Sequence, residues 1–293
     1  MNFYLSWFSF MFLVLVSVFL VFSCDNWFIF WISFELSLMG FIPLFSLNLR
    51  FSDCMIKYFL IQSGGSGLFL FSMLSWYSEF FLFMSLSMKL GLFPFFSWVP
   101  MVMSAMDWLG CFIFTTVQKF IPFCILTIVN KSSVFFTLGV ISVFISGILG
   151  FNQSLLRNLM AYSSISHTGW ISSALYFSHY LGLIYIFIYT ILSYVIMSSF
   201  LEMKLDKVSN CSFNSSVYML ILSGFPPFSV FFLKSLILIH LSGLSIIISL
   251  VALLGASFSA FYYLNFCISN MISTNTSEKY LWVLISFFPI FFV

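Results

Sequence analysis

Residues 88–100, MKLGLFPFFSWVP, place one lysine in a run of apolar side chains and follow it closely with a glycine and a proline. Because Gly91 and Pro94 are both unfavourable inside a helix, we expect the helix that carries Lys89 to be interrupted just after it. A charge beside a broken apolar helix needs a polar or hydrated interior around it. The rest of the sequence has to supply the helices that enclose it.

The composition excludes a water-soluble fold. Of the 293 residues, 62% are hydrophobic and only 6% are charged. A soluble domain of this size could not hide so much apolar surface, so the chain must use lipid as its solvent. The net charge of +2 and the lack of any basic run give no reason to expect a nucleic-acid partner.

Apolar runs of membrane-spanning length follow one another along the chain, joined mostly by short connections. They fall at roughly 3–24, 27–47, 55–74, 79–98, 107–129, 134–151, 154–177, 180–201, 215–240, 243–268 and 280–293. A helix needs about 20 apolar residues to cross the hydrocarbon core, and it satisfies its own backbone groups there. The sequence predicts an all-α integral membrane protein of about 11 transmembrane helices, with residues 1–293 in one domain and 280–293 as the shortest span.

Basic residues are distributed unevenly between the two sides of the predicted bundle. Connections after even-numbered runs, or the helix ends beside them, hold Arg50, Lys57, Arg157, Lys204, Lys207 and Lys279, whereas those after odd-numbered runs hold only Lys131. Basic loops stay on the electronegative side of a membrane. This asymmetry predicts that the N-terminus lies on that side and that the C-terminus lies on the other.

Four charged residues lie inside apolar runs: Glu35, Lys89, Lys119 and Lys234. Each would cost on the order of 3 kcal/mol in lipid, so we expect them to face a protein interior or a water-filled cavity. For a single lysine, snorkelling to the headgroups is the alternative. A lysine amine can gain or lose its proton when a neighbouring charge changes, whereas arginine stays protonated. These residues are therefore our candidate sites for proton transfer.

A second helix interruption is predicted at GFPPF, residues 224–228, shortly before Lys234. The two interrupted runs are the fourth and the ninth, and an odd separation of five makes them cross the membrane in opposite directions. This is the pattern of two inverted five-helix repeats, each with one broken helix. We expect the first repeat over about 3–129, the second over about 134–268, and an extra helix at about 280–293.

One run is unusually polar. Residues 161–170, AYSSISHTGW, hold Tyr162, Ser163, Ser164, Ser166 and His167. These side chains could form a hydrogen-bonded path between two lysines, or they could serve polar packing between helices, and the sequence leaves both interpretations open.

Other motifs argue against cofactor chemistry. QSGGSG, residues 62–67, lacks the lysine and the strand of a phosphate loop and is instead typical of a small-residue packing face. The cysteines have no CxxC spacing and are expected to pack as apolar residues. They are Cys24, Cys54, Cys111, Cys124, Cys211 and Cys267. The sequence shows no dinucleotide fingerprint, iron–sulfur pattern or haem-ligand pair, so we expect no redox centre, bound cofactor or metal in this chain.

Several segments together resemble a known family. In order, they are FELSLMGFIPL (34–44), IKYFLIQSGGSG (56–67), MKLGLFPFFSWVP (88–100), QKFIP (118–122), NQSLLRNLMAYSSISHTGW (152–170) and GFPPFSVFFLK (224–234). Through them the chain closely resembles the family of mitochondrial NADH dehydrogenase subunit 2, an antiporter-like membrane subunit of respiratory complex I. The likeness extends to about residue 240, and the last fifty residues carry little of the pattern.

The resemblance implies proton-transfer roles for Glu35, Lys89, Lys119 and Lys234, which match the family's positions. The chain departs from the pattern at Met101, where the family usually has an acidic residue, and at Asn158, where it usually has a basic one. Eleven spans with a matrix-side N-terminus look like the animal form of this subunit. The C-terminus would then lie in the intermembrane space of the mitochondrial inner membrane.

The resemblance also implies a function within a larger assembly. The expected role is a proton-translocating subunit of NADH:ubiquinone oxidoreductase, with NADH, FMN, iron–sulfur clusters and ubiquinone bound by other subunits. Subunit 4L, which is small, and the antiporter-like subunit 4 are the expected neighbours, with lipids around them. The alternatives are a stand-alone sodium/proton antiporter, which would transport by itself, and a purely structural membrane spacer, in which the lysines would affect stability alone.

Overall fold

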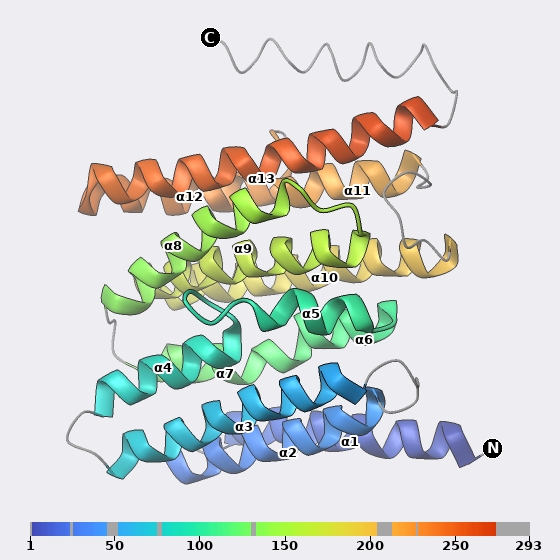
Figure 1. Cartoon of the computed structure of the whole chain (residues 1–293). Coiled ribbons are helices and arrows are strands. Elements are labelled where there is room, and N and C mark those ends of the chain that lie inside the picture. Colours follow the sequence, from blue (N-terminus) through green and yellow to red (C-terminus); the bar gives the residue numbers. More distant parts are fainter. Residues whose placement is uncertain are drawn as a thin grey trace.

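The computed structural model describes residues 2–23, 26–45, 52–74, 78–129, 133–203, 213–226 and 228–273. Regular structure within these residues is helical. The helices are α1 (Asn2–Ser23), α2 (Trp27–Phe45), α3 (Ser52–Leu74), α4 (Ser78–Leu90), α5 (Trp98–Ala105), α6 (Trp108–Thr115), α7 (Val117–Ile128), α8 (Ser133–Gly150), α9 (Leu156–Phe177), α10 (His179–Met203), α11 (Phe213–Ser223), α12 (Ser229–Leu244) and α13 (Ile246–Ser273). Their axes run side by side, with α1 to α3 at one edge of the bundle and α11 to α13 at the other (Figure 1).

Many of these helices have the length and apolar character of membrane spans. Five stretches of the described residues qualify on both counts: Cys54–Leu74, Trp108–Ile128, Ser133–Gly150, His179–Leu201 and Ile246–Ser269. Shorter apolar helices cover Phe10–Ser23, Trp27–Pro43 and Ser229–Leu244. The prediction of an all-helical membrane protein is confirmed. The predicted helix at 280–293, together with Arg50, Lys131, Lys204, Lys207, Lys279 and Pro227, lies outside the described residues.

Both predicted interruptions begin at a glycine with a positive φ. Gly91 has φ +70° between α4 and α5, and Gly224 has φ +81° between α11 and α12. Only glycine adopts this conformation without strain, because it has no Cβ. At Gly91 an added Cβ would also lie 2.5 Å from a methyl group of Val99. Glycine therefore ends the helix in each case, and proline follows in the connection.

A third interruption was not predicted. The run at 107–129 divides at Thr116 into α6 and α7. The Phe112 carbonyl accepts three hydrogen bonds there: from the Thr116 backbone N–H at 3.1 Å, from Thr116 Oγ1 at 2.6 Å and from Thr115 Oγ1 at 3.2 Å. Threonine hydroxyls compete with the helical backbone in this way and bend helices. One turn further on, Pro122 lacks the N–H that would bond the Gln118 carbonyl.

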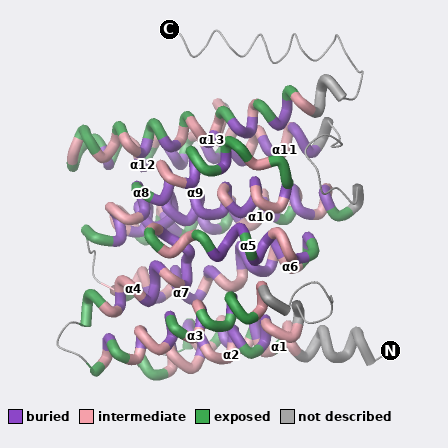
Figure 2. The backbone as a smooth tube through the Cα atoms, viewed as in Figure 1, coloured by how far each residue is buried: buried purple, intermediate pink, exposed green. Residues whose placement is uncertain are grey.

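Helix α9 lies at the centre of the bundle and packs against α5, α7, α8, α10 and α12. Buried residues run along almost its whole length, whereas the outer helices carry long exposed stretches (Figure 2). Its many hydroxyls are accommodated because they donate to carbonyls three residues earlier in the same helix, as Ser163 does to Met160 at 2.8 Å and Ser164 to Ala161 at 2.8 Å. A polar sequence can therefore occupy the core.

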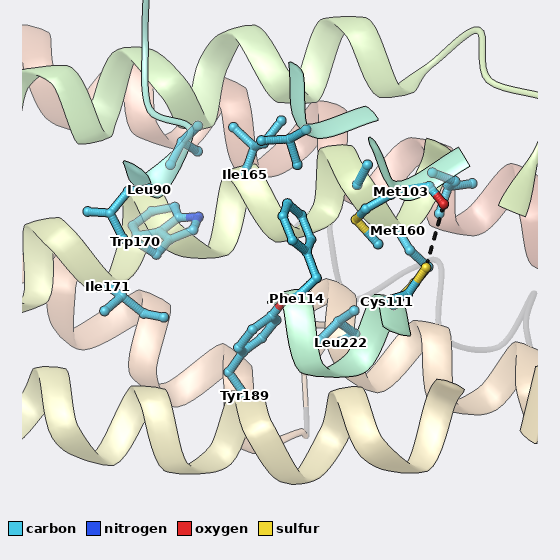
Figure 3. Packing of buried hydrophobic residues seen from close by; sticks show 14 of the residues in the cluster. Leu90, Met103, Cys111, Phe114, Met160, Ile165, Trp170, Ile171, Tyr189 and Leu222 are labelled. Atoms are coloured by element: carbon cyan, nitrogen blue, oxygen red, sulfur yellow. Dashed lines mark hydrogen bonds between the residues drawn. The ribbon is translucent and has the colours of Figure 1, made fainter. Parts of the chain in front are cut away.

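Large apolar side chains fill the space around α9. Figure 3 shows Phe114, Trp170, Tyr189 and Leu222 in this cluster, together with Cys111, whose thiol lies 3.6 Å from the Met103 carbonyl. Cys111 and Cys267 are buried among these residues, in agreement with the predicted packing role of the cysteines. Cys54 and Cys124 are partly exposed free thiols, and Cys24 and Cys211 lie outside the described residues.

Candidate functional site

All three mid-span lysines are buried inside the bundle. Lys89 is 5% exposed, Lys119 4% and Lys234 6%. Each lies next to an interruption: Lys89 in the last turn of α4, Lys119 in the first turn of α7, and Lys234 in α12 after the second break. Helix interruptions leave backbone carbonyls without helical partners. The second break supplies the acceptor for Lys234 in this way, whereas Lys89 and Lys119 donate to carbonyls inside α3 and α9.

The Lys89 amine lies between α2 and α3. Its Nζ donates to the Gln62 carbonyl at 3.3 Å and sits 3.9 Å from the centroid of the Phe34 ring, a cation–π contact. Gly65 leaves room for the lysine stem, since an added Cβ would lie 3.2 Å from Lys89 Cγ. Of the glycines in the stretch at 62–67, Gly65 packs against Lys89, whereas an added Cβ at Gly64 or Gly67 would meet nothing within 4 Å.

Glu35 lies at the same interface between α2 and α3. It is half-buried on α2 next to Phe34, and Ser66 Oγ of α3 donates to its Oε1 at 2.5 Å. Glu35 is near enough to act on Lys89 electrostatically. The carboxylate and the amine, both in the described part of the chain, form no ion pair with each other. The two groups interact at a distance, each held by its own polar contact.

The Lys119 amine points to α9. Its Nζ donates to the Ser164 carbonyl at 3.4 Å. The neighbouring Gln118 turns the other way and donates from Nε2 to the Ser37 carbonyl of α2 at 3.3 Å. The first turn of α7 therefore connects the helix that carries Glu35 with the central helix α9.

The Lys234 amine caps the C-terminus of α11. It donates to the Ser223 carbonyl at 2.7 Å, and Ser223 is the last residue of that helix. A cation at a helix C-terminus is favoured, because unpaired carbonyls give that end a partial negative charge. Gly224 leaves room for the amine, since an added Cβ would lie 3.3 Å from Nζ. Trp170 of α9 faces it, with 6.0 Å from the ring centroid to Nζ.

Three residues spaced by three along α9 link the last two lysines. Ser164 accepts from Lys119, Trp170 faces Lys234, and His167 lies between them. Both lysines are close enough to His167 to act on it electrostatically. Its Nδ1 lies 3.0 Å from the hydroxyl of Tyr185 on α10. One face of α9 therefore runs from Lys119 to Lys234 with a titratable ring at its middle.

The other polar candidates on α9, Ser163, Ser166 and Tyr162, make no hydrogen bond to a lysine within the described part of the chain. Ser163 and Ser166 are buried and donate to carbonyls of their own helix, Met160 at 2.8 Å and Ser163 at 2.7 Å respectively. Tyr162 is only partly buried and belongs to the edge of the packed cluster. Sequence reasoning missed Phe34, Ser66, Trp170 and Tyr185 as contacts of the site. Nothing in the sequence marks Tyr185, because it lies in an ordinary apolar run.

In the described residues, no group of three or more histidine, cysteine, aspartate or glutamate side chains is placed to hold a metal ion.

A helical membrane bundle with lysines buried at helix interruptions defines the chain as an antiporter-like membrane protein. The family described as NADH:quinone oxidoreductase/Mrp antiporter, TM, matches residues 75–260. NADH-ubiquinone oxidoreductase chain 2 of Lumbricus terrestris is 32% identical over 285 residues, covering 88% of this chain and 84% of the relative. The same protein of Artemia franciscana is 31% identical, covering 87% of each. The chain belongs to the NADH-ubiquinone oxidoreductase chain 2 family.

Solved structures have the same fold. A chain of respiratory complex I from Thermus thermophilus with bound aureothin has a TM-score of 0.83 at 19% identity, covering 90% of this chain and 70% of that one. A chain of the Mrp complex from Dietzia sp. has a TM-score of 0.79 at 13% identity, covering 92% of this chain and 60% of that one. At these identities the likeness concerns the fold alone.

Proposed function

We propose that this chain is a membrane subunit of NADH:ubiquinone oxidoreductase that carries protons across the mitochondrial inner membrane. The observation that carries the proposal is the burial of three lysines at helix interruptions, two of them linked by one face of α9. The relatives named NADH-ubiquinone oxidoreductase chain 2 support membership of the enzyme. In this proposal NADH, FMN, iron–sulfur clusters and ubiquinone belong to other subunits.

Proton transfer would begin at Glu35 and Lys89. A charge change in a neighbouring subunit alters the interaction between these two groups, and Lys89 then releases or takes up its proton. Proton movement continues to Lys119 and along the α9 face through His167 to Lys234. Each amine has a backbone carbonyl as its partner, so it stays polar-bonded while its proton is exchanged.

The architecture we infer is two inverted repeats. The order of the described helices supports it, because each half contains one helix pair broken at a glycine with positive φ, α4–α5 and α11–α12. The spans then number about eleven, with the N-terminus in the matrix and the C-terminus in the intermembrane space. Subunits 4L and 4 of the enzyme are the expected neighbours.

Replacing Lys89 with methionine in the assembled enzyme tests the proposal. Proton pumping coupled to quinone reduction should fall by roughly 10²-fold, because an acid–base group is lost, while the amount of assembled enzyme stays the same. Lys57→Met is the matched control, since Lys57 is an exposed lysine of α3. Pumping at the wild-type ratio in Lys89→Met would contradict the proposal.

A stand-alone sodium/proton antiporter is the second candidate, and the match of residues 75–260 to a family that also includes Mrp antiporters favours it. That function predicts ion exchange by the purified chain in vesicles when a sodium or proton gradient is applied. Our proposal predicts that the isolated chain catalyses no such exchange.

A further inference from the structure

Two buried tyrosines of α10 lie against His167, and two buried tyrosines of α13 lie next to each other nearby. Tyr185 and Tyr189 come from α10, and Tyr262 and Tyr263 come from α13; their exposures are 1%, 4%, 2% and 1%. We call these four residues the tyrosine cluster. The Tyr189 ring lies 5.0 Å from the His167 ring, and the Tyr262 and Tyr263 rings lie 4.5 Å apart, measured between centroids. The cluster is outside the row of lysines, and the proposed proton path makes no use of it.

Three of its hydroxyls lack a hydrogen-bond partner among the described residues: those of Tyr189, Tyr262 and Tyr263. Ser163 lies beside Tyr263 and Ser166 beside Tyr262, but both serine hydroxyls donate to carbonyls of α9 instead. A buried hydroxyl without a partner is destabilising, because it has lost its hydrogen bonds to water. Three of them side by side are the kind of polar surface that binds internal water.

The proton-transfer role of His167 restricts its tautomer. Its Nδ1 faces the Tyr185 hydroxyl at 3.0 Å, and its Nε2 makes no hydrogen bond to the described residues. To exchange protons with the flanking lysines, Nε2 must be unprotonated in the neutral ring. The proton is then on Nδ1 and is donated to Tyr185, because the bond at one ring nitrogen sets the state of the other. The Tyr185 O–H must donate elsewhere.

We propose that the tyrosine cluster binds an internal water that accepts the Tyr185 proton, and that Tyr185 thereby holds His167 in the tautomer with Nε2 free. The water donates in turn to the oxygens of Tyr189 and Tyr263, the cluster members that act electrostatically on Tyr185. Protons pass from Lys119 to Nε2 and on to Lys234, while Tyr185 keeps its own proton. Tyr185 is a positioning residue. This inference rests on the proposed function.

The test compares Tyr185→Phe with Tyr194→Phe in the assembled enzyme. Tyr194 is on the same helix but 57% exposed, so it controls for loss of a hydroxyl from α10. Tyr185→Phe should lower the protons pumped per NADH and slow pumping by roughly tenfold, less than the ~10²-fold typical of losing an acid–base group. Tyr194→Phe should leave both unchanged. Tyr263→Phe, which removes one ligand of the water, should give a smaller loss.

A density map of the wild-type enzyme that resolves ordered water supplies the second readout. A water within about 2.7–3.2 Å of the hydroxyls of Tyr185, Tyr189 and Tyr263 is expected. Absence of that water, or wild-type coupling in Tyr185→Phe, overturns the inference. Wild-type coupling in Lys234→Met would instead overturn the proposed function, so the two failures are distinguishable.

Discussion

Lys89 of α4 and Glu35 of α2 are both bound to α3, by residues one helical turn apart. The lysine amine donates to the Gln62 carbonyl, and the Ser66 hydroxyl donates to the Glu35 carboxylate. The two charges are not in direct contact. A direct ion pair would fix both groups in their charged states, whereas separated charges can respond to a third charge nearby. This arrangement suits the first step of proton transfer.

Removing the Ser66 hydroxyl should weaken this step. In Ser66→Ala the half-buried carboxylate of Glu35 loses a donor, which costs about 1–3 kcal/mol and changes its interaction with Lys89. We expect fewer protons pumped per NADH, measured in sealed vesicles. Ser63→Ala is the control, because the Ser63 hydroxyl donates only to the Leu60 carbonyl of its own helix. An equal effect of both changes would contradict a specific role of the Ser66 bond.

Gly224 forms the second helix break and also lies against the Lys234 side chain. Alanine there would adopt a strained positive φ at a cost of about 1–3 kcal/mol, and its Cβ would lie against the lysine amine. Gly224→Ala should therefore lower both thermal stability and pumping. Gly243→Ala of α12 is the matched control, since nothing lies within 4 Å of an added Cβ. Normal pumping in Gly224→Ala would show that the position of the Lys234 amine is not critical.

The contact between α8 and α9 depends on glycine. A Cβ on Gly169 would lie 2.5 Å from the Gly139 carbonyl, and backbone cannot move aside cheaply. Gly169→Ala should cost roughly 1–3 kcal/mol by overpacking and lower the melting temperature of the solubilised enzyme. Gly67→Ala in α3, where an added Cβ meets nothing within 4 Å, should not lower it. Equal melting temperatures for the two variants would argue against close α8–α9 packing.

The helix breaks at glycine and the burial of the lysines could be predicted from the sequence, because both follow from the properties of single residues. Gly91 with Pro94, and Gly224 with the prolines after it, mark helix ends because their backbone preferences hold in any context. Burial of the lysines followed from the cost of charge in lipid. The turn at Thr116 was missed, because its cause is competition by threonine hydroxyls, without a glycine to signal it.

Contacts between distant helices could not be predicted. The bond between His167 and Tyr185 depends on how α9 and α10 are rotated about their axes, and neither sequence run specifies that rotation. Both interpretations of residues 161–170 stay predictions. Ser163 and Ser166 serve their own helix, whereas His167 lies between the lysines.

The central claim is that buried lysines exchange protons, and Lys119→Arg tests it most directly. Arginine keeps the positive charge but does not release its proton, so it separates a titrating group from a fixed charge. The measurement is protons pumped per NADH oxidised, compared with Lys119→Met at equal amounts of assembled enzyme. Our account predicts that arginine fails as methionine does. Wild-type pumping with arginine at position 119 would contradict it.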